Sequence, residues 1–135
     1  MPADRACLDT NILIYAFSQD KKAQPAKDIM ASADVISVQA LNEFAHVASR
    51  KLGMSWAEVS ESIALIRGFC FNVIPIGTDV HEHGLAIADR YQVSFFDALM
   101  IAAALSAECD VLWSEDMHHG LLIDGRLRIT NPFHA

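Results

Sequence analysis

The sequence predicts an α/β domain with a mainly parallel β-sheet flanked by helices. Short apolar runs alternate along the chain with longer stretches of helical periodicity, which is the order expected when helices connect parallel strands. The 135 residues, of which 53% are hydrophobic and 20% charged, are enough for a domain with a full core. We therefore expect a single domain over residues 1–135.

In the first part of the chain, two apolar runs predict buried strands, and the stretches between and after them predict helices. Leucine and alanine side chains recur at helical spacing after the second run, and Gly53 is placed to stop that helix. In chain order we expect a strand at 5–8, helices at 11–17 and 24–33, a strand at 34–37 and a helix at 38–52.

The second part of the chain carries clearer boundary signals. Ser55 and Glu58 have the spacing of a capping box, and Thr78 is placed to cap a later helix. The stretch 95–108 is apolar on all sides, which predicts burial between layers, and we assign Phe95 and Phe96 to the core. In chain order we expect a helix at 55–70, a strand at 71–76, helices at 79–91 and 95–108, a strand at 110–114 and, after an Asp-Gly turn, a strand at 127–130.

Composition also limits the class of protein. The net charge of −7 argues against a general basic surface for nucleic acid, although a nuclease that gathers carboxylates around a metal can be acidic overall. No apolar run reaches the roughly 18 residues of a membrane helix, and we see no secretory signal. Cys7, Cys70 and Cys109 are odd in number and far apart, which predicts reduced core residues of a cytoplasmic protein.

Four carboxylates stand at the ends of predicted elements. Asp9 follows the first strand, Asp116 follows the strand at 110–114, Asp97 opens the apolar helix, and Glu43 lies in the helix after the second strand. Each has an ordinary interpretation: Asp9 as a helix cap, Asp97 as a capping-box partner of Ser94, Asp116 as a loop acid and Glu43 as a solvated surface residue. In open parallel sheets, however, ligands bind beyond the carboxyl ends of the strands.

Carboxylates that converge in one cleft repel one another unless a cation neutralises them. Hard divalent cations such as Mg²⁺ and Mn²⁺ select oxygen ligands. Hydrolysis of phosphate esters is the chemistry that uses such clusters, because the ion activates a water molecule and screens the phosphate charge. A receiver or phosphatase domain is disfavoured, since no Lys follows residue 51 and position 11 is Asn.

Five stretches together resemble PIN-domain ribonucleases, and most of all the VapC-type toxins of bacterial toxin–antitoxin pairs: "LDTNILIYA", "ISVQALNEF", "YQVSFFDALMIAAAL", "LWSEDMHHG" and "LRITNPF". The resemblance covers nearly the whole chain, in the right order and spacing. It implies a PIN-like three-layer sandwich with a five-stranded, mainly parallel sheet in the order 3-2-1-4-5. The first and fourth strands would then be neighbours, so that Asp9 and Asp116 flank one cleft.

The resemblance also implies a site and an activity. The site would comprise the acids Asp9, Glu43, Asp97 and Asp116, oriented by Thr10, Asn11 and Ser114. These acids would bind Mg²⁺ or Mn²⁺, with Glu43 alternatively deprotonating the attacking water, and Glu115 competes with Asp116 for the fourth position. The activity would be endoribonuclease cleavage of RNA that leaves a 5′-phosphate and a 3′-hydroxyl.

Further expectations concern partners. The resemblance to these toxins implies a homodimer and inhibition by a small antitoxin, and the negative charge suits a basic partner. Lys21, Lys22 and Lys27 form a small basic group that is ordinarily a solvated face. A PIN scaffold that binds RNA or a protein without cleaving is the alternative function. The RNA target, the cleavage sequence and the number of metal ions stay open.

Overall fold

A six-stranded sheet forms the centre of the molecule in the computed structural model, which describes residues 4–134. The strand order is β3-β2-β1-β4-β6-β5, and the first five of these strands are parallel, which confirms the predicted order. The strands are β1 (Ala6–Leu8), β2 (Val35–Ser37), β3 (Asn72–Ile74), β4 (Val111–Trp113), β5 (Leu122–Ile123) and β6 (Leu127–Thr130).

The sixth strand, β5, was not expected from the sequence. It pairs antiparallel with β6 at the edge of the sheet, and a turn through Asp124 and Gly125 joins the two strands. Both turn residues have a positive φ, 52° and 67°, as a tight hairpin turn of right-handed twist requires. A strand of two residues is too short to show any periodicity, so only its turn was predicted.

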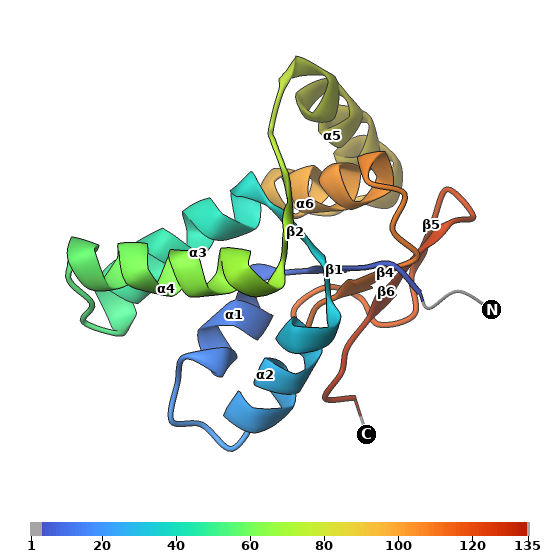
Figure 1. Ribbon diagram of the computed structural model, residues 1–135. Helices are drawn as coiled ribbons and strands as arrows, with labels where there is room; N and C mark the ends of the chain where they lie inside the picture. The colour runs from blue at the N-terminus through green and yellow to red at the C-terminus, as the bar shows by residue number, and fades with distance from the viewer. Residues whose placement is uncertain (1–3, 135) are drawn as a thin grey trace.

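Helices cover both faces of the sheet (Figure 1). In that view α5 and α6 lie above the sheet, α1 and α2 lie below it, and α3 and α4 lie to the left. Helix α3 contacts both α1 and α6, so it joins the two helical layers. The helices are α1 (Thr10–Ala16), α2 (Ala23–Ser32), α3 (Val38–Lys51), α4 (Trp56–Phe69), α5 (Thr78–Tyr91) and α6 (Phe95–Ser106).

Side-chain caps begin most of the helices that surround the sheet. The predicted capping box of Ser55 and Glu58 is present in both directions at the start of α4. The Ser37 hydroxyl accepts a hydrogen bond from the amide of Ala40 and caps α3. The prediction that Thr78 caps α5 is wrong, because the helix begins at Thr78 and is preceded by Gly77, which has no capping side chain.

Helix α6 is the most buried helix, as its uniform apolar sequence predicted. Every residue from Ala98 to Leu105 is buried. The assignment of Phe96 to the core is wrong, because 59% of its surface is exposed in the first turn of the helix. The three cysteines are free and buried, as expected. Within residues 4–134 no helix combines the length and the apolar character needed to cross a bilayer.

Candidate active site

The parallel pairing of β1 and β4 brings the ends of these strands to one edge of the sheet. Leu8 lies opposite Trp113, so the residues that follow, Asp9 and Ser114, leave the sheet together. The amide of Asp9 donates a hydrogen bond of 2.9 Å to the carbonyl of Trp113. This register fixes the backbone on which the candidate site is built.

Asp9 uses its two carboxylate oxygens for different purposes. Oδ1 accepts a 2.6 Å hydrogen bond from the amide of Thr10, so that Asp9 caps α1. Oδ2 accepts hydrogen bonds from the Ser114 hydroxyl at 2.7 Å and from Asn11 Nδ2 at 3.0 Å. The ordinary prediction of a helix cap is therefore confirmed, and it leaves the second oxygen facing the side chains that follow β4.

The environment of Asp9 opposes its negative charge. The side chain is only 3% exposed, and this burial is the main cause that raises its pKa from 3.8 to about 6. Hydrogen bonds from Ser114 and Thr10 lower the pKa, whereas the negative charges of Asp97 and Glu43 raise it further. Asp9 is thus an ionisable group whose charge the surrounding protein does not neutralise.

Asn11 connects three acidic residues. Its Nδ2 donates to Asp9 Oδ2 and, at 3.2 Å, to Asp116 Oδ2. Its Oδ1 accepts a 3.1 Å hydrogen bond from the amide of Glu115, which fixes the orientation of the side-chain amide. Thr10 contributes through its backbone, because its hydroxyl contacts the sulfur of Met100 at 3.8 Å instead.

Asp97 and Glu43 approach the site from α6 and α3. The amide of Asp97 donates to the Ser94 hydroxyl, so Ser94 caps α6, but the reciprocal bond of the predicted capping box is not among the hydrogen bonds of the described residues. Burial raises the pKa of Asp97, with the charge of Asp116 acting in the same direction and the Ser94 hydrogen bond against it. Glu43 is partly buried and accepts a 3.0 Å hydrogen bond from Gln39 Nε2, so it is not the freely solvated residue that a helical wheel suggests.

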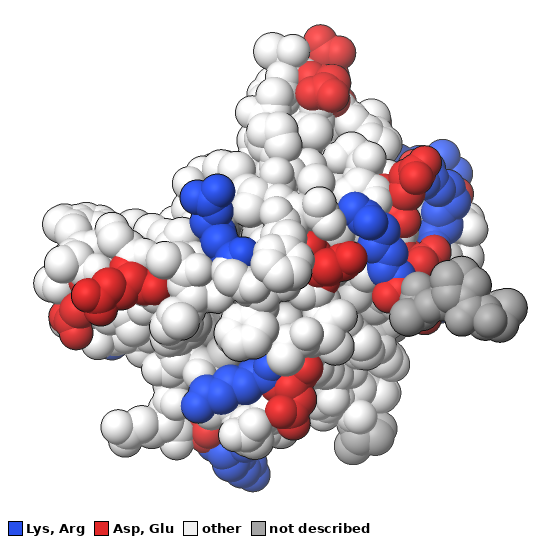
Figure 2. All heavy atoms as spheres, in the orientation of Figure 1, with Lys and Arg blue, Asp and Glu red and all other residues white. Residues whose placement is uncertain are grey.

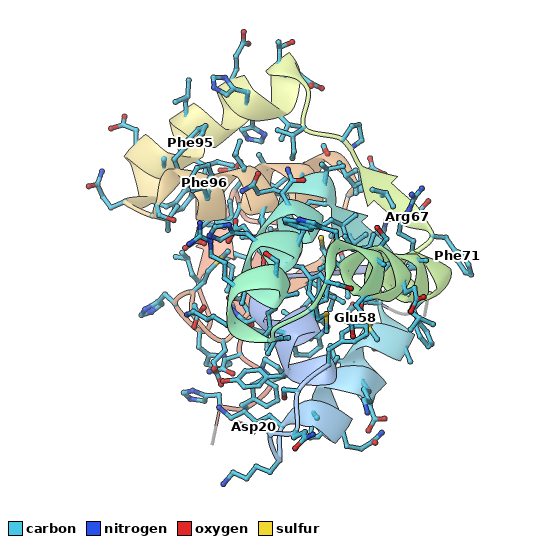
Figure 3. All side chains as sticks on the ribbon, turned by 90° about the vertical axis from the view of Figure 1, so that its left-hand side faces the viewer. Asp20, Glu58, Arg67, Phe71, Phe95 and Phe96 are labelled. Carbon is cyan, nitrogen blue, oxygen red and sulfur yellow. The ribbon has the colours of Figure 1, made fainter. Side chains whose placement is uncertain are left out.

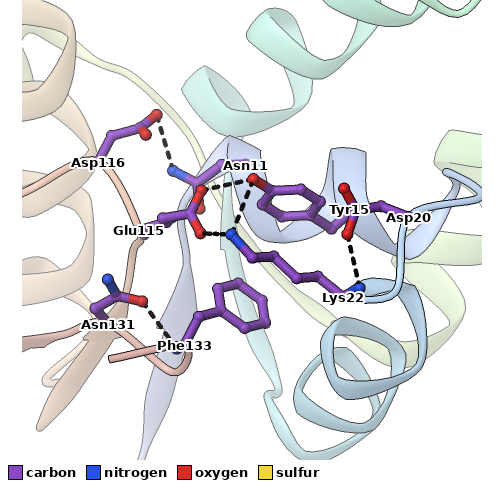
Figure 4. A network of polar contacts seen from close by, with 8 residues as sticks. All are labelled: Asn11, Tyr15, Asp20, Lys22, Glu115, Asp116, Asn131 and Phe133. Carbon is purple, nitrogen blue, oxygen red and sulfur yellow. Dashed lines mark hydrogen bonds and ion pairs between the residues drawn. The ribbon is translucent and has the colours of Figure 1, made fainter. Parts of the chain in front are cut away.

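Glu115 and Asp116 have different surroundings (Figure 4). Glu115 forms an ion pair with Lys22 and accepts a 2.6 Å hydrogen bond from the Tyr15 hydroxyl. Burial opposes the charge of Glu115, but the hydrogen bonds from Lys22 and Tyr15 outweigh it and lower the pKa. Asp116 is exposed and bonded to Asn11, so it is the acid whose charge is free to face a ligand.

A cleft of about 340 Å³ brings the predicted acids together. Its lining residues include five carboxylates and, among the described residues, no Lys, Arg or His. Ser114 is fully buried behind Asp9 and does not line the cleft. The lining residues are Asp9, Thr10, Asn11, Ile14, Tyr15, Glu43, Val47, Asp97, Glu115 and Asp116.

The carboxylates of the cleft are not already arranged as a metal-binding site. Across the part of the chain that the structure describes, no three His, Cys, Asp or Glu side chains stand in the arrangement of a metal site. The carboxylates at the cleft nevertheless offer oxygen ligands, and among the described residues only Glu115 has a cationic partner, Lys22. Such a set suits Mg²⁺, which keeps several of its waters and needs only one or two carboxylates.

Sequence reasoning missed several residues of this region. Tyr15, Ile14 and Val47 line the cleft, and Lys22 pairs with Glu115 rather than forming part of a solvated basic face. The contacts of Tyr15 and Lys22 with Glu115 join positions 100 and 93 residues apart, and no local pattern indicates them. Their only sequence signal was that Tyr15 lies one helical turn beyond Asn11, on the same face of α1.

No Lys or Arg among the described residues lines the cleft, although Lys22 lies beside it through its ion pair with Glu115. On the face that Figure 2 shows, the Lys and Arg side chains of the described residues lie in separate spots among acidic ones. This distribution agrees with the net charge of −7.

The fold and the site define a class: an α/β domain whose parallel sheet ends in a carboxylate-lined cleft. The sequence model of the PIN domain matches residues 6–119, and the chain therefore belongs to the PIN-domain family. No curated protein sequence matches the chain.

Several solved structures share the fold. A toxin–antitoxin complex from Klebsiella pneumoniae has a chain that is 24% identical, with a TM-score of 0.72, and the match covers 96% of this chain and 99% of that one. The sarcin-ricin-loop-cleaving toxin VapC20 of Mycobacterium tuberculosis is 19% identical over 79% of this chain and 86% of its own, with a TM-score of 0.66. VapBC2 of Rickettsia felis, bound to a promoter DNA fragment, matches at 15% identity and a TM-score of 0.68 over 93% of this chain and 97% of that one.

Proposed function

We propose that this protein is a cytoplasmic, metal-dependent endoribonuclease that acts as the toxin of a toxin–antitoxin pair. The observation that carries the proposal is the position of Asp9, a buried carboxylate with a raised pKa that faces Asp97 and Glu43 without a neighbouring cation. An acidic group in such a place is costly for the folded chain and is a signature of a functional site. Membership of the PIN family and the shared fold of the toxins support the same conclusion.

Asp9, Asp97 and Asp116 would hold Mg²⁺ or Mn²⁺, directly or through water. The ion, when bound, would supply positive charge for the phosphodiester and make water more acidic. Asn11 and Ser114 would keep the Asp9 carboxylate in place, because their hydrogen bonds restrict its rotation.

Glu43 is the candidate proton acceptor. It lies across the cleft from the strand ends, on α3, and Gln39 holds one of its oxygens. From this place it would either contact the metal or orient and deprotonate the water that attacks the phosphorus in line. Such an attack would leave a 5′-phosphate and a 3′-hydroxyl.

A small antitoxin is the proposed partner, and a homodimer is the proposed assembly. The structural neighbours include toxin–antitoxin complexes, and the negative charge of this chain suits a basic partner. An apolar cavity of about 450 Å³ between α1, α2 and α4, lined by Phe17, Met30, Leu65 and Phe69 among others, offers a place for an antitoxin side chain to dock.

The test is cleavage of RNA with Mg²⁺ or Mn²⁺, compared with the same reaction in EDTA. The Asp9→Asn and Asp97→Asn variants should lose cleavage, because each removes a charge from the cleft while keeping the size of the side chain. Glu61→Gln is the matched control, since Glu61 is an exposed acid of α4 outside the cleft. Full activity in both Asp variants would overturn the site, and binding of RNA without any cleavage would favour a non-catalytic scaffold.

A further inference from the structure

A second groove adjoins the acidic cleft. It has a volume of about 390 Å³ and lies between α3 and the first turn of α6. Glu43 and Val47 line both the groove and the cleft, so the two are continuous. The residues that line it are Gln39, Asn42, Glu43, His46, Val47 and Phe96.

Phe96 is the unusual feature of this groove. Its side chain is 59% exposed although the helix that carries it is otherwise the most buried of the fold. The ring of Phe95 packs against it at 5.9 Å between centroids, and the ring of His81 in turn forms a T-shaped pair with Phe95 at 5.5 Å between centroids. Figure 3 shows Phe95 and Phe96 together at the start of α6. Phe96 is therefore a supported aromatic platform, and the next residue is Asp97.

The opposite wall of the groove is polar. Asn42 and His46 are exposed on α3, one helical turn apart, and the Gln39 amide is oriented by its hydrogen bond to Glu43. Amide and imidazole groups can pair with the edges of an unstacked base. The groove thus combines a face for stacking with groups for hydrogen bonding.

The charge distribution also favours a ligand that binds by stacking on an aromatic ring. A protein with a net charge of −7, and with no Lys or Arg among the described residues that line the groove and the cleft, gains little affinity from the phosphate backbone. Stacking on an aromatic side chain supplies affinity without positive charge and is common in the recognition of single-stranded RNA. A second copy of the chain fits less well, because Phe96 is the only large exposed apolar side chain among the described residues that line this groove.

We propose that this groove binds one unpaired nucleobase of the RNA substrate, stacked on Phe96 with its edge toward Asn42 and His46, beside the phosphate that lies in the acidic cleft. This subsite rests on the proposed endoribonuclease function. It adds to that function the recognition of one base next to the phosphodiester that is cleaved.

The first experiment measures cleavage of a random-sequence ribohexanucleotide pool by the full chain in Mg²⁺. Phe96→Ala should raise KM about ten-fold and leave kcat within about two-fold, since stacking contributes binding and no chemistry. Phe96→Trp should restore the KM. Phe71→Ala is the matched control, because Phe71 is also exposed, at 78%, and Figure 3 shows it far from Phe96.

The second experiment moves an abasic site along one cleaved ribohexanucleotide. At the position that occupies the groove, loss of the base should raise KM for the wild type, and Phe96→Ala should add no further loss, because both changes remove the same contact. Additive effects at every position would overturn the subsite. An unchanged KM in Phe96→Ala, with a lowered mass in sedimentation equilibrium, would assign Phe96 to an interface between copies instead.

Failure of the proposed nuclease function can be distinguished from failure of the base subsite. If the wild type cleaves none of the pool, the proposed function fails, and the groove is tested by binding of a ribohexanucleotide that contains 2-aminopurine. Quenching of its fluorescence by the wild type and by Phe71→Ala, but not by Phe96→Ala, would support the base subsite. Equal quenching by all three proteins would overturn it.

Discussion

Replacement of Asp9 by Asn should stabilise the metal-free protein at neutral pH. A carboxyl group with a higher pKa in the folded than in the unfolded chain binds more protons when folded, so its ionisation favours unfolding. The contribution of Asp9 to stability is therefore fully present below about pH 4 and is lost as the pH rises through its folded pKa of about 6. The Asp9→Asn variant would have no charge to accommodate at this position at any pH.

The size of this effect follows from the pKa of Asp9. The rise from 3.8 to about 6 corresponds to about 3 kcal/mol at pH 7.5, at 1.36 kcal/mol for each pKa unit. The new amide also loses something, because an NH₂ group in place of Oδ2 cannot accept the hydrogen bond that Asn11 Nδ2 now donates, whereas the Ser114 hydroxyl can turn and accept from it; the cost is about 1 kcal/mol. We expect a net gain of about 2 kcal/mol at pH 7.5 and a small loss near pH 4.

The assay is denaturant unfolding of both proteins in EDTA at pH 4.0 and pH 7.5, followed by far-ultraviolet circular dichroism. The difference between Asp9→Asn and the wild type should move by about 2 kcal/mol between the two pH values, in favour of the variant at the higher pH. The hydrogen-bond loss cancels from this comparison because it is present at both pH values. An equal difference at both pH values would refute the raised pKa and reduce Asp9 to an ordinary helix cap.

Three further predictions concern the neighbours of Asp9. Ser114→Ala should lower the free energy of unfolding by about 1–2 kcal/mol at pH 7.5, because it removes a buried hydrogen bond to the Asp9 carboxylate, and denaturant unfolding measures it. Glu115→Gln should lower the raised pKa of Tyr15, because the Glu115 carboxylate now accepts a hydrogen bond from the protonated hydroxyl and repels the phenolate; ultraviolet titration in a Tyr91→Phe background isolates that tyrosine. Millimolar Mg²⁺ should raise the Tm of the wild type but not of Asp9→Asn, as differential scanning fluorimetry would show.

Strand-end reasoning singled out Asp9 and Asp116 as candidates, and the strand order implied by the resemblance made the first and fourth strands neighbours, as the pairing of β1 and β4 confirms. Once two apolar runs are placed side by side, the residues that follow them, Asp9 and Asp116, must meet at one edge. Glu43 could not be found in this way. It lies at the border of the buried face of α3, where helical periodicity assigns it to solvent, and only the resemblance placed it in the cleft.

The features that the sequence did not predict have physical reasons too. Helix α6 is apolar on every side, so periodicity could not show that Phe96 faces outward. Lys22 meets Glu115 through a contact between the loop before α2 and the loop after β4, and no local pattern specifies such a pair. Gly77 rather than Thr78 precedes α5, because a helix boundary can shift by one residue without changing the packing of its apolar face.

Equilibrium binding of Mn²⁺ tests the central claim most directly, because the acidic cleft is proposed to hold a divalent cation. Electron paramagnetic resonance reports the free ion as it is titrated into the wild type, Asp9→Asn, Asp97→Asn and the control Glu61→Gln. The wild type and Glu61→Gln should bind Mn²⁺ alike, and both Asp variants should bind it at least about ten-fold more weakly. A wild type that takes up no Mn²⁺, or Asp variants that bind it as well as the control does, would contradict the account.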